Sequence, residues 1–327
     1  MALRKSTLKD MYWAMLLARR LDERAWVLHR QGKIAFHISG IGQEAAQVGA
    51  AFALQRGVDW IVPYYRDLAL MVAFDFTAKE YMLSLFGKKG ETTSGARQMP
   101  NHWSIRKENI VSHSSPVATQ TPHASGIGLA IKMRGDDAVV LTTIGEGSTS
   151  QGEWYEGVNW AAIHKLPVLF MVENNVYAIS VPQERQMAVE SVADKAKGLG
   201  LPGLSVDGLD PIAVHDAVSD SAAHARKGEG PTLIEVRVSR MTPHSSDDDD
   251  RSYRTREEVE DMKARDPLPI FGAHLLNSKV ISQSELDHLD EKAKAEVDEA
   301  VEHADGAPYP EVAEAMYPVY VEDIKHG

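Results

Sequence analysis

Two stretches near the middle of the chain, Val139-Val-Leu-Thr-Thr-Ile-Gly-Glu-Gly147 and Val168-Leu-Phe-Met-Val-Glu-Asn-Asn175, decide the fold. Their apolar, β-branched starts are typical of strands that are buried on both faces of a parallel sheet. The segment between them, Gly152 to His164, has the apolar spacing of a helix, so the three predict a right-handed βαβ unit. Thr232 to Val238 predicts a third strand, preceded by a helix from about Pro211 to Arg226. We therefore expect an α/β fold with a doubly wound, mostly parallel sheet flanked by helices.

Helical patterns lie on both sides of this central unit. Apolar residues recur at helical spacing from Leu8 to Arg30, and the alanine-rich segment from Gln43 to Gln55 favours a second helix. Towards the other end, Ser282 to His303 is a charged helical pattern. The acidic stretch from His244 to Asp250 has too little apolar content to pack by itself and predicts a mobile loop.

Length and composition bound the possible functions. The 327 residues predict a single α/β cofactor-binding domain over 1–327, with an N-terminal helical arm over about 1–35 and a C-terminal helical extension over about 275–327. Lys and Arg number 35 against 47 Asp and Glu, and the formal charge of −12 would repel a nucleic-acid backbone. The absence of cysteine excludes disulfides and thiolate metal sites and is compatible with a reducing cytoplasm. No apolar run approaches the roughly 20 residues of a membrane-spanning helix. We expect a soluble, cytoplasmic protein without a nucleic-acid or membrane partner.

Polar motifs follow both central strands at the point where each strand ends. Gly145-Glu146-Gly147 ends the first strand and Glu173-Asn174-Asn175 ends the second, so the crossover returns Asn175 beside Glu146. Magnesium takes about six oxygen ligands, typically from one or two carboxylates, from diphosphate and from water. Glu146, the amide oxygen of Asn175 and a nearby backbone carbonyl can supply the protein's share. The glycines and the helix that starts near Ser150 let the backbone approach a diphosphate. The two motifs therefore predict a magnesium-bound diphosphate cofactor.

Three other interpretations of these motifs are open at this point. Either motif alone is more often an ordinary turn, and only their pairing favours a cofactor site. A nicotinamide-dependent dehydrogenase could use the same sheet, but its Gly-x-Gly-x-x-Gly turn is absent, because Ser150 and Ile131 stand where its third glycine would be. A non-catalytic scaffold could keep the fold without the cofactor.

The paired motif resembles that of thiamin diphosphate enzymes, which begins with Gly-Asp-Gly and ends in Asn-Asn. From about His37 to Tyr253 the chain resembles the alpha subunit of the 2-oxoacid dehydrogenase first component, a family that includes branched-chain and pyruvate dehydrogenases. Branched-chain members often carry Glu in the middle of the first motif, so Glu146 favours a branched-chain substrate over pyruvate or acetoin. The other matching segments are His37 to Ala46, Tyr64-Tyr-Arg-Asp67, Arg97-Gln-Met-Pro100, Ser114-Ser-Pro-Val-Ala-Thr-Gln120, Tyr177-Ala-Ile-Ser180 and Arg240 to Arg254.

The resemblance implies thiamin diphosphate and Mg²⁺ as cofactors and assigns roles to individual residues. Magnesium would be held by Glu146, Asn175 and the backbone carbonyl of Tyr177. His244 would bind the cofactor and assist acyl transfer as a catalytic residue, although a histidine in an acidic loop is usually only solvated. Further cofactor-binding residues would be Tyr65, Arg66, Gly147 and Ser148 at the diphosphate, Ser115 and Val117 near the aminopyrimidine, and Ile179. A monovalent-cation site for K⁺ would involve Ser114, Pro116, Thr119 and Gln120.

One position departs from the family pattern. Glu173 stands where several branched-chain relatives carry an arginine that contacts the diphosphate. Since a carboxylate cannot do so, either Arg66, the magnesium and His244 carry more of the anion's charge, or Glu173 points away and pairs with a base elsewhere. For Arg66 itself, the alternative to a diphosphate contact is a surface ion pair, for example with Asp67.

Thiamin chemistry also needs a carboxylate at the aminopyrimidine, and the sequence contains no second domain to hold it. The family supplies this carboxylate from a separate beta chain in an α2β2 heterotetramer. The resemblance therefore implies half of an enzyme. That enzyme would decarboxylate a 2-oxoacid and transfer the acyl group to the lipoyl domain of an acyltransferase component in a multienzyme complex.

Overall fold

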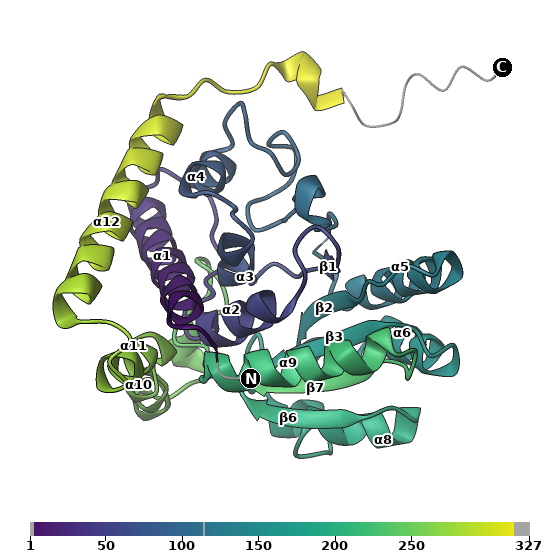
Figure 1. The fold of residues 1–327 in the computed structure, drawn as a ribbon. Coiled ribbons are helices and arrows are strands. Elements are labelled where there is room, and N and C mark those ends of the chain that lie inside the picture. The colour runs from purple at the N-terminus through teal and green to yellow at the C-terminus, as the bar shows by residue number, and fades with distance from the viewer. Residues whose placement is uncertain (1–2, 114, 317–327) are drawn as a thin grey trace.

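A five-stranded parallel sheet forms the centre of the protein, whose computed structural model describes residues 3–113 and 115–316. The strand order is β1-β2-β3-β7-β6 (Figure 1). The two central runs of the sequence are neighbouring parallel strands, as predicted, and the predicted third strand lies next to them. The strands are β1 (Trp60–Val62), β2 (Val140–Gly145), β3 (Val168–Asn174), β6 (Gly203–Asp207) and β7 (Thr232–Arg237). The predicted doubly wound α/β fold is confirmed.

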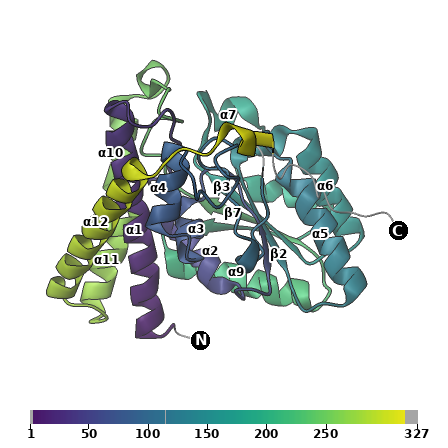
Figure 2. The same cartoon turned by 90° about the horizontal axis from the view of Figure 1, so that it is seen from above.

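Side chains of the central strands alternate between two apolar cores, one on each face of the sheet. Met171 of β3 packs in the core that includes α2 and α9, whereas Phe170 packs in the core that includes α5 and α6. Because successive strand residues point to opposite faces, a fully apolar strand requires helices on both sides. Figures 1 and 2 show α1, α11 and α12 on one side of the molecule and α5 and α6 on the other. The four helices named for the cores are α2 (Glu44–Ala53), α5 (Gln120–Arg134), α6 (Gly152–Ile163) and α9 (Pro211–Arg226).

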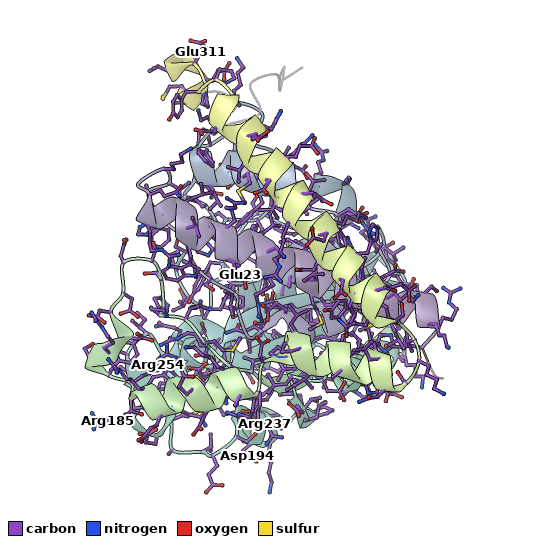
Figure 3. All side chains as sticks on the ribbon, turned by 90° about the vertical axis from the view of Figure 1, so that its left-hand side faces the viewer. Glu23, Arg185, Asp194, Arg237, Arg254 and Glu311 are labelled. Atoms are coloured by element: carbon purple, nitrogen blue, oxygen red, sulfur yellow. The ribbon has the colours of Figure 1, made fainter. Side chains whose placement is uncertain are left out.

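Two long helices from opposite ends of the chain pack together outside the sheet. Figure 3 shows α12 (Gln283–Gly306) crossing α1 (Lys5–Arg30), and an ion pair of 2.5 Å connects Arg20 to Asp290. A capping box formed by Ser282 starts α12 where the sequence predicts it. The predicted C-terminal extension reaches residue 327, and its last part, 317–327, lies outside the described residues.

Shorter elements connect these layers. The acidic stretch is a loop, as predicted, and the backbone N–H of Ser246 in it donates to the carbonyl of His37 at 2.9 Å. Within the described residues, no helix is long and apolar enough to cross a membrane. The remaining elements are α3 (Leu68–Ala73), α4 (Ala78–Phe86), η1 (Arg106–Glu108), η2 (Glu146–Ser150), β4 (Tyr177–Ala178), β5 (Val181–Pro182), α7 (Gln183–Gln186), η3 (Val192–Asp194), α8 (Lys195–Leu199), η4 (Asp250–Ser252), α10 (Arg256–Ala264), α11 (Pro267–Asn277) and η5 (Val312–Met316).

Candidate cofactor site

The two polar motifs meet at the carboxyl edge of the sheet. Gly145, the last residue of β2, lies beside Glu173 of β3 in the parallel register. Glu146 then opens the 3₁₀ turn η2, and its Oε2 accepts a hydrogen bond of 3.2 Å from the backbone N–H of Asn175. The βα crossover therefore returns the second motif to the first, as the sequence predicts.

Glu146 and Asn175 each keep one buried oxygen without a hydrogen-bond partner. The two residues are 1% and 5% exposed, and nothing in the described part of the chain donates to Glu146 Oε1 or Asn175 Oδ1. An unpaired buried polar atom lowers the stability of the fold by about 1–3 kcal/mol. Two unpaired oxygens on residues that contact each other therefore indicate a site for a bound cation. Carboxylate and amide oxygens are ligands that magnesium accepts. Burial raises the pKa of the Glu146 carboxyl, and a bound cation would oppose this shift.

A metal site made of His, Asp and Glu side chains alone is not present among the described residues. Residues 3–113 and 115–316 contain no group of three or more His, Asp or Glu side chains placed to hold a metal ion. A cation at Glu146 must therefore take amide and backbone oxygens as further ligands. Magnesium sites that also use diphosphate and water oxygens need only one or two protein carboxylates.

A cavity opens next to these two residues, at the edge where the strands end. Most of the residues that the sequence analysis assigned to the cofactor line it, which brings together segments from five parts of the chain. Tyr64, Gln151 and Ala178 line it too, although the sequence analysis assigned them no role. The predicted residues that line the cavity are Tyr65, Arg66, Val117, Glu146, Gly147, Ser148, Asn175, Tyr177, Ile179 and His244.

Arg66 is buried beside this cavity and is not a surface residue. It is 2% exposed, and its guanidinium donates to the carbonyl oxygens of Ser39 and His244. Asp67 turns the other way and accepts hydrogen bonds from the backbone of Tyr64 and the hydroxyl of Thr143. The alternative of a surface ion pair between Arg66 and Asp67 is therefore wrong. A buried guanidinium without a carboxylate partner favours an anionic ligand.

His244 contacts Arg66 and has a strongly perturbed side chain. Nη2 of Arg66 lies 3.3 Å from Nδ1 of His244. Because a guanidinium has only donors, Nδ1 must accept and the ring proton lies on Nε2. Burial, followed by the positive charges of Arg66 and Arg240, lowers the pKa of His244 to about 3. The imidazole is neutral at physiological pH and can donate from Nε2.

Arg240 is a second buried cation near the cavity, and the sequence analysis assigned it no individual role. It is 1% exposed and donates to the carbonyl of Ile179 at 2.7 Å and to the hydroxyl of Tyr253 at 3.1 Å. Burial, then repulsion from Arg66, lowers the pKa of Arg240 to about 10. Its position three residues after β7 is the signal that could have identified it, since ligand sites gather beyond strand ends.

Glu173 points away from the cavity, but it does not pair with a base. Its Oε2 accepts hydrogen bonds from Gln47 Nε2 at 3.0 Å and from the hydroxyl of Tyr64 at 3.1 Å. Burial raises the pKa of Glu173 to about 7, and burial together with the charge of Glu173 raises the pKa of Asp67. Oε1 of Glu173 and Oδ1 of Asp67 have no donor among the described residues, and a proton held between the two carboxyl groups would pair both oxygens. The sequence hypothesis of a basic partner is wrong, because the described side chains that hydrogen-bond Glu173 are Gln47 and Tyr64.

Comparison with known proteins places this site in a family. A model of the family "Dehydrogenase E1 component" matches residues 12–313. The chain belongs to this family. It is 53% identical over 311 residues to the 2-oxoisovalerate dehydrogenase subunit alpha of Bacillus subtilis strain 168, covering 95% of this chain and 94% of that protein.

Two pyruvate dehydrogenase E1 component alpha subunits are also similar to the chain. The one from B. subtilis strain 168 is 37% identical over 321 residues, which is 98% of this chain and 83% of that protein. The one from Staphylococcus aureus strain Mu50 is 36% identical over 308 residues, with 94% and 80% covered. The E1 family depends on thiamin diphosphate, and its alpha subunits work with beta subunits and lipoyl-bearing components. The nicotinamide-dependent alternative is therefore wrong, consistent with the missing third glycine.

Three details of the site differ from the expectations drawn from the sequence. A side chain at Gly147 would lie 2.6 Å from the Cβ of Ala178, so this glycine lets the β4 segment pack onto η2. At Gly145 a side chain would meet nothing within 4 Å, so no protein atom demands a glycine there. Ser115 does not line the cavity, and its hydroxyl lies 2.5 Å from Nε2 of His102.

Proposed function

We propose that this chain is the alpha subunit of a branched-chain 2-oxoacid dehydrogenase first component, of the 3-methyl-2-oxobutanoate dehydrogenase type. It would decarboxylate the oxoacid oxidatively and transfer the acyl group to the lipoyl domain of an acyltransferase component. The identity of 53% to a 2-oxoisovalerate subunit, against 37% to a pyruvate subunit, supports this substrate, as does Glu146. The observation that carries the cofactor assignment is the pair of unpartnered oxygens on Glu146 and Asn175, next to buried Arg66.

These groups fit a magnesium diphosphate. Glu146 Oε1, Asn175 Oδ1 and the backbone carbonyl of Tyr177 would hold Mg²⁺, while Arg66 and the Nε2 proton of His244 would bind diphosphate oxygens. Tyr65, Gly147, Ser148 and Ile179 would form the walls around the diphosphate, with Val117 and Ser115 towards the aminopyrimidine. When bound, thiamin diphosphate supplies the nucleophilic thiazolium carbon that attacks the 2-oxoacid carbonyl. The anion would also offset the repulsion between Arg66 and Arg240, which stabilises the bound state.

His244 is suited to a second role in acyl transfer. Its ring is kept neutral, with the proton on Nε2, by burial and by the guanidinium on Nδ1. A neutral imidazole that lines the cavity can donate a hydrogen bond from Nε2 to an oxygen of the substrate or to a lipoyl sulfur, and so orient and polarise it. We assign His244 as the catalytic residue of this chain on that ground.

A beta subunit in an α2β2 heterotetramer would complete the site. Among the described residues, Glu146 is the one carboxylate that lines the cavity, and the metal would take it, so the carboxylate for the aminopyrimidine would come from another chain. The outward side of α5 and α6 supports such a partner. Large apolar side chains are exposed there, namely Met133, Tyr155, Trp160 and Ile163, at 78%, 43%, 47% and 65%. Exposed apolar clusters of this kind are typical of subunit interfaces, and α6 starts directly after cavity residue Gln151.

A monovalent cation such as K⁺ would bind at the start of α5. Gln120 is 4% exposed, and its Oε1 has no hydrogen-bond partner among the described residues. The hydroxyl of Thr119 donates to the carbonyl of Pro116 at 2.9 Å, which holds the turn together. Ser114, the fourth residue of the predicted site, lies outside the described residues.

The organisation and compartment of the chain are part of the same proposal. We propose one α/β cofactor-binding domain over 1–327, to which α1 adds an N-terminal arm and α12 a C-terminal extension. The absence of cysteine is compatible with action in the cytoplasm.

Co-expression with a beta subunit tests the proposed function. The purified pair should reduce an artificial electron acceptor in the presence of thiamin diphosphate, Mg²⁺ and 3-methyl-2-oxobutanoate, and more slowly with pyruvate or acetoin. A preference for pyruvate or acetoin would overturn the substrate assignment, and failure to bind thiamin diphosphate and Mg²⁺ in calorimetry would support a non-catalytic scaffold.

The proposed subunit interface is tested separately. Trp160→Glu combined with Ile163→Glu should abolish co-purification of the beta chain, whereas Ile270→Glu, also at an exposed isoleucine, should not.

A further inference from the structure

The loop that carries the proposed carbonyl ligand has a strained backbone. Val176 and Ile179, on either side of Tyr177 and Ala178, have φ angles of 62° and 58°. Positive φ is a genuine outlier for β-branched residues and costs on the order of 1–3 kcal/mol at each position. Such strain persists only where the surrounding contacts hold the backbone in place. The loop must therefore be fixed by specific neighbours.

Gln183, the first residue of the one-turn helix α7, supplies several of these contacts. Its backbone N–H donates to the carbonyl of Val176 at 2.9 Å, and its side-chain Oε1 accepts from Asn174 Nδ2 at 2.9 Å. Its Nε2 donates to the carbonyl of Glu190 at 2.7 Å, which anchors the glutamine itself. Gln183 thus holds both sides of Asn175.

Gln186, one turn later on α7, holds the other motif. Its Nε2 lies 3.2 Å from the carbonyl oxygen of Glu146, 3.3 Å from that of Gly147 and 2.6 Å from the hydroxyl of Ser150. All three acceptors belong to or adjoin the turn η2, which presents the carboxylate of Glu146 to the cavity. One short helix therefore contacts both motifs of the proposed metal site.

We propose that Gln183 and Gln186 are positioning residues that set the separation between the two halves of the magnesium site. The proposal rests on the proposed function, because it concerns the ion held by Glu146, Asn175 and the carbonyl of Tyr177. Magnesium demands near-ideal octahedral geometry at about 2.0–2.1 Å, whereas calcium tolerates flexible sites with longer bonds. We call Gln183 and Gln186 the glutamine clamp. Because the clamp fixes the separation between the metal ligands, it favours magnesium over calcium.

The test is calorimetric titration of metal ions into the co-expressed alpha and beta pair at saturating thiamin diphosphate. Gln186→Met and Gln183→Met keep side-chain length but remove the amide contacts. Each should raise the Kd for Mg²⁺ roughly 10-fold or more, the usual effect of losing a contact to a metal ligand. The Kd for Ca²⁺ should change less than threefold, because a looser site still accommodates that ion.

Arg185 provides the matched control on the same helix. It lies between the two glutamines, is exposed, and projects at the edge of the molecule in Figure 3. Arg185→Met should leave both metal affinities and the unfolding temperature of the metal-free pair unchanged. Unfolding of the metal-free glutamine variants distinguishes positioning from a general role in stability.

Four outcomes of these measurements have separate meanings. Wild-type affinity for Mg²⁺ in both glutamine variants would overturn the clamp. Equal losses of Mg²⁺ and Ca²⁺ affinity, together with a lower unfolding temperature without metal, would also overturn it, because the glutamines would then only hold the fold. If the unaltered pair binds neither thiamin diphosphate nor Mg²⁺, the proposed function fails instead. A selective loss of Mg²⁺ affinity in a pair of unchanged stability supports the clamp.

Discussion

Glu146 and Glu173 stand at the ends of neighbouring parallel strands and are almost equally buried, at 1% and 0% exposure. Their surroundings differ. Glu146 receives one hydrogen bond from Asn175 and keeps an unpartnered oxygen at the cavity. Oε2 of Glu173 accepts from Gln47 and Tyr64, whereas its Oε1 has no donor among the described residues and would be paired only by a proton held between Glu173 and Asp67. An unpaired oxygen alone therefore does not make a buried carboxylate a metal ligand. The unpaired oxygen of Glu146 belongs to a residue that lines the cavity, where a cation can bind and offset its desolvation, whereas Glu173 is coupled to a second carboxyl group.

The largest expected effect comes from removing the carboxylate with the free oxygen. Glu146→Ala should weaken Mg²⁺-dependent binding of thiamin diphosphate by roughly 100-fold or more and abolish turnover of the alpha and beta pair. Calorimetry and oxoacid-dependent acceptor reduction measure the two effects. Glu173→Gln is the matched control at the neighbouring strand end and should keep the Mg²⁺ affinity within about threefold. Equal turnover in wild type and Glu146→Ala would remove the metal assignment.

A smaller effect is expected at Glu173, on the pH dependence of the unfolding free energy. A proton held between Glu173 and Asp67 would cause it. Its pKa in the folded protein is about 7, above its ordinary value of 4.5, so the fold favours the protonated carboxyl. That contribution to stability is complete below pH 4.5 and is lost as pH rises through 7. Glu173→Gln resembles the protonated form, and its unfolding free energy relative to wild type should rise by on the order of 2 kcal/mol between pH 5 and pH 8. Urea unfolding of the cofactor-free chain measures this, and a difference independent of pH would contradict the shared proton.

The smallest effect is expected at His244. Its pKa is lowered by folding, whereas that of Glu173 is raised, so its contribution to stability is lost at low pH. Its pKa falls from an ordinary value of 6.5 to about 3, so the fold favours the neutral ring. Its contribution is complete above pH 6.5 and is lost as pH falls towards 3. Between pH 7 and pH 5, wild type should lose roughly 2 kcal/mol more stability than His244→Gln in the cofactor-free state, slightly less than the change expected at Glu173. Thermal unfolding at both pH values measures the difference. Bound thiamin diphosphate and Mg²⁺ should reduce it, and a difference that persists unchanged would exclude contact between His244 and the anion.

Local patterns predicted the long elements well and the short ones poorly. The helix predicted from Leu8 to Arg30 corresponds to α1, and the helix predicted from about Pro211 to Arg226 corresponds to α9. Asp210 caps α9, and Pro211 fits its first turn. β1 has three residues, too few for a periodic signal, and β6 alternates apolar Leu204 and Val206 with polar residues over only five positions, a pattern that the sequence analysis did not identify as a strand. Their strand conformation depends on pairing with β2 and β7.

The sequence by itself determined which residues form the proposed metal half of the site. Gly145 to Gly147 and Glu173 to Asn175 end adjacent strands, so elementary α/β topology brings Glu146 to Asn175. Tertiary structure alone decided which glutamate faces the cavity, how burial raises the pKa of Asp67 and of Glu173, and how Gln183 and Gln186 join both motifs. These outcomes rest on contacts between residues far apart in the sequence, on burial and on hydrogen-bond geometry. A linear pattern of residue types does not contain them, because the same glutamate is a ligand or a proton carrier according to what surrounds it.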